Sequence, residues 1–83
     1  MDRLRGTLKF DYDHASDVLY SYVNKPRRAY TKETANGNIF LRVDPTTQKL
    51  VGFTIVGYRE KLRKGLLHQI PHFGQVDLPV PKK

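Results

Sequence analysis

Three aspartates lie close together near the start of the chain and are the first candidates for chemistry. Asp11, Asp13 and Asp17 could act as paired carboxylates in acid-base catalysis or as oxygen ligands for a hard cation. Asp13 and Asp17, however, bracket a short polar segment between two strand-like patterns, where aspartate commonly accepts hydrogen bonds from backbone N–H groups. We therefore predict that Asp13 and Asp17 are structural turn residues and that Asp11 is a solvated strand residue.

The three histidines are the candidates for a metal site. His68 and His72 are four residues apart, but Pro71 between them interrupts the helical turn that would present both on one face. The sequence contains no cysteine, which excludes thiolate ligands and disulfides. Ser16 beside His14 gives no evidence of a nucleophile and base, because adjacency in a loop does not set their geometry. We expect no metal, no cofactor and no catalytic residue, so the protein is not expected to be an enzyme.

Basic and aromatic residues alternate around Pro26 in a way that suits single-stranded nucleic acid, with cations for phosphates and rings for base stacking. A second basic group lies in a predicted helix further along the chain. The residues of this alternative site are Lys25, Arg27, Arg28, Tyr30, Arg59, Arg63 and Lys64. The competing interpretation is a solvated loop and a solvated helix face, with the tyrosines packed in a sheet.

Length and composition indicate one small, basic, folded domain. The chain has 83 residues, with 15 Lys and Arg against 8 Asp and Glu, so the net charge is +7. This charge makes a polyanion a candidate partner, although it also serves solubility. No apolar run is long enough to cross a membrane or act as a signal peptide, so we expect a cytoplasmic protein. We assign residues 1–83 to a single domain, with a core at about residues 7–70 and an extended, proline-containing tail at residues 71–83.

Apolar and polar residues alternate with a period of two in several segments, which predicts antiparallel strands. The segments are residues 7–12, 18–23, 29–33, 39–43 and 50–56. We expect the second strand to pair back on the first and the short third strand to form an edge. Asn36 and Gly37 predict a tight turn before the fourth strand, and Asp44 with Pro45 predicts the turn that follows it.

The hairpin at residues 38–56 is expected to be the centre of the sheet. Its second strand is apolar on both faces, with Val51, Phe53 and Ile55 in one row, so we expect a cover on each side. From Tyr58 the apolar period changes to that of a helix, which is the natural cover for the second face. Gly65 either ends this helix or is followed by a further apolar turn. After Pro71, the apolar tail residues Phe73, Val76 and Leu78 are expected to pack against the sheet.

One stretch is similar to a known family. The pattern Tyr12-Asp13-x-x-x-Asp17-x-Leu19-Tyr20, followed by an apolar strand, an acidic turn and residues 50–55 (LVGFTI), resembles the small bacterial family labelled domain of unknown function 2283. The chain departs from it at Thr54, where the family more often has glutamate, and in the turn after Asp44. The resemblance implies a compact antiparallel sheet with a helix at its end, no assigned activity and, for some members, proximity to small toxin-like partners.

These observations predict an α+β fold, in which an antiparallel sheet of about four or five strands carries one C-terminal helix. We expect a small protein-interaction module that acts by homodimerisation or by docking one protein partner, for example a partner of the toxin-antitoxin type. The alternative is a nucleic-acid-binding module that uses the basic loop and the helix face.

Overall fold

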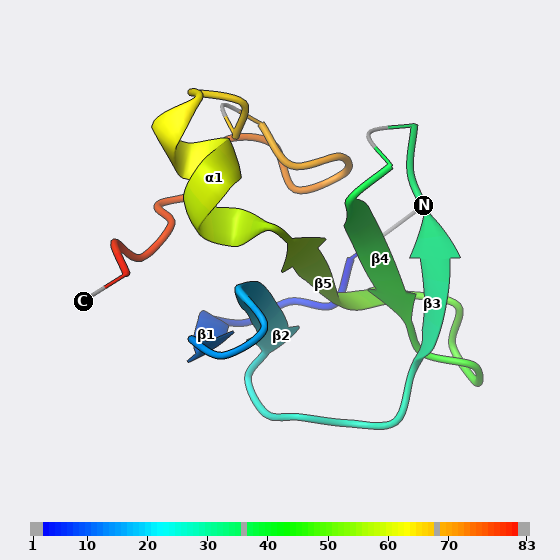
Figure 1. The fold of residues 1–83 in the computed structure, drawn as a ribbon. Coiled ribbons are helices and arrows are strands. Elements are labelled where there is room, and N and C mark those ends of the chain that lie inside the picture. The colour runs from blue at the N-terminus through cyan, green and yellow to red at the C-terminus, as the bar shows by residue number, and fades with distance from the viewer. Residues whose placement is uncertain (1–2, 36, 68, 82–83) are drawn as a thin grey trace.

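A computed structural model describes residues 3–35, 37–67 and 69–81. It contains five strands and one short helix, and so confirms the predicted α+β class (Figure 1). The elements are β1 (Leu8–Asp13), β2 (Val18–Val23), β3 (Tyr30–Glu33), β4 (Ile39–Val43), β5 (Leu50–Val56) and α1 (Tyr58–Arg63). No helix in these three ranges has the length and apolar character needed to cross a membrane.

The strands form one antiparallel sheet in the order β1-β2-β5-β4-β3. This order confirms three predictions: β2 pairs with β1, β5 is central, and β3 is an edge. Because β2 and β3 are separated by β5 and β4, residues 24–29 must run past one end of the sheet, as Figure 1 shows below β5 and β4.

The turns follow from short polar side chains. In the β4–β5 turn, Asp44 Oδ1 accepts hydrogen bonds from the backbone N–H groups of Thr46 (2.7 Å) and Thr47 (3.1 Å), which confirms the predicted role of Asp44. Gln48 then adopts a positive φ of 61°. Of the predicted Asn36–Gly37 turn, Asn36 lies outside the described residues, and Gly37 has the positive φ (74°) that glycine tolerates best.

One face of the sheet, which we call the core face, carries the hydrophobic core. Phe53 at its centre contacts the rings of Phe10 and Phe73, with centroids 6.5 Å and 5.1 Å away, both in edge-on geometry. The buried cluster is Leu19, Ile39, Leu41, Val43, Leu50, Phe53, Ile55, Tyr58, Ile70 and Phe73. Val76 and Leu78 pack against this cluster, so the tail lies on the sheet as predicted.

The predicted apolar row of β5 is wrong at one position. The pairing of β4 with β5 shifts register between Arg42 and Val43, so that Val43 is opposite Leu50. Such a bulge adds one residue to one strand and reverses the side to which the next side chain points. Leu50 therefore joins the core cluster, while Val51 lies among residues of the opposite face.

The position of the helix is also different from the prediction. Tyr58 is fully buried in the core cluster and Leu62 packs against it, so α1 sits at the end of the core face rather than over the second face of β5. The helix ends at Arg63, because Gly65 takes a left-handed conformation (φ 68°). Leu66 is 58% exposed and does not extend the apolar stripe.

The opposite face of the sheet, which we call the open face, has no cover from α1 or from residues 70–78. The strand register defines its two central rows. They are Asp11, Tyr20, Thr54, Phe40 and Glu33, and Lys9, Tyr22, Gly52, Arg42 and Thr31.

Candidate functional site

The basic loop at residues 24–29 is partly pinned to the sheet. Arg27 is half-buried, and its Nη2 donates a hydrogen bond to the backbone oxygen of Val23 (3.1 Å). Lys25 and Arg28 are exposed. Only part of the predicted basic loop is therefore a freely solvated surface.

The tyrosines that flank this loop in the sequence do not form one stacking platform. Tyr22 lies on the open face, opposite Gly52. Tyr30 is opposite Val43 and so points to the side of the core face, where its hydroxyl donates to Gln48 Oε1 (2.8 Å). A nucleic acid that stacks on one ring would not reach the other on the same side of the sheet.

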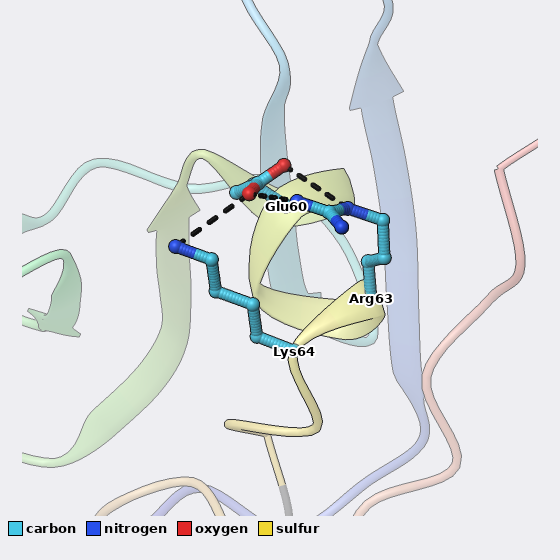
Figure 2. A network of polar contacts seen from close by, with 3 residues as sticks. All are labelled: Glu60, Arg63 and Lys64. Carbon is cyan, nitrogen blue, oxygen red and sulfur yellow. Dashed lines mark hydrogen bonds and ion pairs between the residues drawn. The ribbon is translucent and has the colours of Figure 1, made fainter.

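The second predicted basic group, on α1, is partly neutralised within the helix. Glu60 forms ion pairs with Arg63 and, at 3.5 Å, with Lys64 (Figure 2). The Arg63 guanidinium hydrogen-bonds to Glu60 and holds the pKa of this carboxyl below its usual value. The pairs are exposed, so each contributes little to stability.

The two basic groups lie at opposite ends of the sheet. The helix follows Val56, which pairs with Val18 at the start of β2, whereas the basic loop follows Val23 at the end of β2 (Figure 1). A six-residue strand spans about 20 Å. The structure thus does not bring the loop cations Lys25, Arg27 and Arg28 together with the helix cations on one surface.

The turn aspartates make structural contacts. Asp13 Oδ1 accepts a hydrogen bond from Ala15 N (3.0 Å), and bonds from the Ser16 side chain and from Ala15 lower the pKa of Asp13. Asp17 reaches much further along the chain. Its Oδ1 accepts from Tyr12 Oη (2.6 Å) and from Arg59 N (2.9 Å), in the first turn of α1.

Asp17 thereby takes the place of a helix cap. The residue before the helix is Gly57, which has no side chain to cap it, and the backbone oxygen of Asp17 accepts from both Gly57 N and Tyr58 N. Partial burial by itself would raise the pKa of Asp17, but the hydrogen bonds from Tyr12 and Arg59 outweigh it and leave this pKa below its usual value. Burial raises the pKa of Tyr58, whose hydroxyl donates to Pro79 O, to about 12.

The two histidines in the described part of the chain, His14 and His72, do not form a cluster. The His14 ring is exposed and contacts the Tyr12 ring edge-on, with centroids 4.6 Å apart. His72 is exposed in a turn with positive φ, and His68 lies outside the described residues. Within the described ranges, no three His, Asp or Glu side chains are grouped as metal ligands.

A pocket of about 190 Å³ lies between the basic loop and the open face. Its lining includes Asp11, Tyr20, Tyr22, Arg27, Arg42 and Val51. Gly52 lies between Tyr22 and Arg42 in the register, and a Cβ there would be 2.1 Å from the backbone oxygen of Ser21. Glycine is therefore required where β5 approaches β2 beside the pocket.

Sequence reasoning identified Arg27 but missed Arg42 and the pocket. Arg42 is predictable only as a polar residue on one side of a strand. Gly52, which is opposite Arg42 in the next strand, was the sequence signal that could have indicated the pocket, because a glycine inside a strand often marks a close approach of another backbone or a ligand. Thr54, where the family resemblance leads to an expectation of glutamate, is half-buried on the open face between Tyr20 and Phe40.

No known family model matches the chain, and neither a curated protein nor a solved structure shows significant similarity to it. The resemblance to domain of unknown function 2283 therefore depends on the residues quoted for it.

Proposed function

We propose that this protein is a small protein-interaction module that forms a homodimer by pairing the β3 edges of two copies. The observation that carries the proposal is the state of β3. All four of its residues are exposed, and among the described strands its one neighbour in the sheet is β4. An edge strand presents unpaired backbone N–H and C=O groups to another strand, which can extend the sheet.

The side chains of β3 favour one particular register. In a two-fold dimer with an axis perpendicular to the sheet, both copies keep the same face up, so residues on one face oppose residues on that face. With Thr31 opposite the second copy's Thr31, Tyr30 is opposite the second copy's Lys32. This register pairs two threonines and places an ammonium group beside an aromatic ring, both of which are favourable cross-strand pairs.

The next register along the edge is disfavoured. It would place Lys32 opposite the second copy's Lys32, and like charges directly opposite each other destabilise a strand pair. The charges of β3 therefore favour the register centred on Thr31 over the one centred on Lys32. They also discourage pairing with edges that carry lysine at the matching position.

Single cysteines test the dimer directly, because the chain contains no cysteine of its own. In the proposed register, the two Thr31 Cα atoms would be about 4.5–5.5 Å apart, which is within the range that a disulfide spans. We expect Thr31→Cys to give a disulfide-linked dimer rapidly on mild oxidation, and light scattering on the unmodified protein to give a dimer mass.

Two matched variants serve as controls. Lys32→Cys tests the register, because the two Lys32 residues would be offset from each other, and Thr46→Cys places a thiol in an exposed turn away from β3. Equal rates of cross-linking for Thr31→Cys and Thr46→Cys, together with a monomeric mass, would refute the dimer. Faster cross-linking of Lys32→Cys would refute the register.

A different protein could use the same edge. The family resemblance favours a small toxin-like partner, which would add a strand to β3 in place of the second copy. We do not extend the proposal to nucleic acid, since the basic loop and the basic helix face lie at opposite ends of the sheet.

A further inference from the structure

The pocket under the basic loop is lined by charged residues that have no ion-pair partner among the described residues. Its lining residues include two arginines, Arg27 and Arg42, and one aspartate, Asp11. Within the described ranges, the ion pairs are those of Glu60 with Arg63 and Lys64. Among the described residues, Arg27, Arg42 and Asp11 are therefore not in ion pairs with one another.

Arg27, which lines the pocket, has an unsatisfied donor. Its Nε is buried and has no hydrogen-bond partner among the described residues, although its Nη2 donates to Val23 O. A buried N–H group without an acceptor is unfavourable, and an arginine fork suits two oxygens of one planar group. A bound anion would be attracted by the pocket's excess of one positive charge.

The rest of the lining suits a ring. Tyr20, which is 39% exposed, and half-buried Tyr22 offer aromatic surface, and the buried Val51, turned to this face by the bulge, adds an apolar lining residue. The volume of about 190 Å³ is close to that of the ~150 Å³ cavities that hold benzene. It is smaller than the roughly 300–1,000 Å³ of typical sites for larger ligands. One ring with one anionic group matches this size.

Asp11 selects the charge of the ligand. A dianion such as a phosphate monoester would place its second negative charge near this carboxylate, which would repel it. A monoanion has no second charge to be repelled. We propose that the pocket binds a small aromatic monocarboxylate through Arg27 and Arg42. The site is independent of the proposed dimer, because none of its lining residues comes from β3.

Titration of the ¹⁵N-labelled protein with benzoate, followed by NMR, tests this site. We expect shifts at the Arg27 and Arg42 side-chain N–H groups and at the surrounding backbone, with a Kd of about 1 mM, as befits a ligand of so few atoms. Benzamide has the same ring without the charge, and inorganic phosphate has charge without a ring. Both should bind at least about tenfold more weakly than benzoate if charge and ring act together.

Arg42→Gln is the cleanest variant, because the side chain of Arg42 makes no hydrogen bond or ion pair among the described residues and lies on the open face. It should weaken benzoate binding at least about tenfold, whereas Arg42→Lys should restore part of the affinity. Arg28→Gln removes the same charge from an exposed position beside Arg27 in the basic loop. It should leave the affinity for benzoate unchanged.

Three results would overturn the site. One is equal binding of benzamide and benzoate, another is equal weakening by Arg28→Gln and Arg42→Gln, and the third is the absence of shifts at the pocket residues. Preferential binding of phosphate would replace the aromatic carboxylate with a simple oxyanion and would also contradict the proposal. Backbone spectra of each variant establish that it is folded before its affinity is compared.

Discussion

The two edge strands of the sheet occupy equivalent places in the topology and have opposite environments. β1 alternates half-buried and exposed residues, and its residues Leu8, Phe10 and Tyr12 pack against the core. Leu8 and Phe10 also line a hollow with the tail residues Gln75 to Asp77. β3 is exposed at all four positions. The difference indicates that β1 stabilises the domain through its buried side chains, whereas β3 is available to pair with another strand.

The cause of the difference is local sequence. β1 has an apolar or aromatic residue at every second position, so one of its faces can be buried. β3 reads Tyr-Thr-Lys-Glu and offers only Tyr30, which is 42% exposed. A strand that buries so little is held mainly by its backbone hydrogen bonds to β4.

The largest expected effect comes from truncating one aromatic residue in each edge. Phe10→Ala removes a ring that packs edge-on against Phe53, and it should lower the free energy of unfolding by roughly 2–3 kcal/mol. Tyr30→Ala should lower it by less than about 1 kcal/mol, because the ring is exposed. Urea denaturation at low protein concentration, where association is weak, measures both. Equal losses would contradict the contrast between the edges.

A smaller effect is expected where β1 is connected to the helix. Asp17→Asn keeps the size of the side chain but weakens the hydrogen bonds from Tyr12 Oη and Arg59 N. We expect a loss of about 1–2 kcal/mol, with no change in metal content. Ser16→Ala, in the same turn, is a useful comparison, because it tests the Asp13 side of the turn without touching the helix.

The pH dependence of this loss follows from the lowered pKa of Asp17. A group whose pKa is lower in the folded state stabilises the protein above its unfolded pKa, and this contribution disappears as the pH falls through the folded pKa. The difference in stability between the unmodified protein and Asp17→Asn should therefore be complete at neutral pH and shrink below about pH 4. A difference that stays constant down to pH 2 would show that charge is not involved.

The strands and their hairpins are predictable from the sequence because each carries its own row of apolar residues. The β4–β5 bulge is not, since Leu50 and Val51 are both apolar and only the pairing with Arg42 and Val43 decides which of them enters the core. The end of α1 could be anticipated from Gly65. The face that the helix covers could not, because it depends on where Tyr58 is buried.

The candidate site is less predictable than the fold. Arg27 and Arg42 come from a loop and a strand that meet only because residues 24–29 cross the end of the sheet. The link from Asp17 to Arg59 joins residues 42 positions apart. The aspartate pattern alone indicates a turn, and it carries no information about the helix that Asp17 caps.

Amide hydrogen exchange at low and high protein concentration tests most directly whether β3, and not β1, is the edge that pairs. The outward amides of β3 should exchange rapidly in dilute solution and become protected as the concentration rises, because they would bond to the second copy's β3. Amides of β1 should exchange at the same rates at both concentrations. Exchange in β3 that is independent of concentration, or protection that appears in β1 instead, would contradict the proposed dimer.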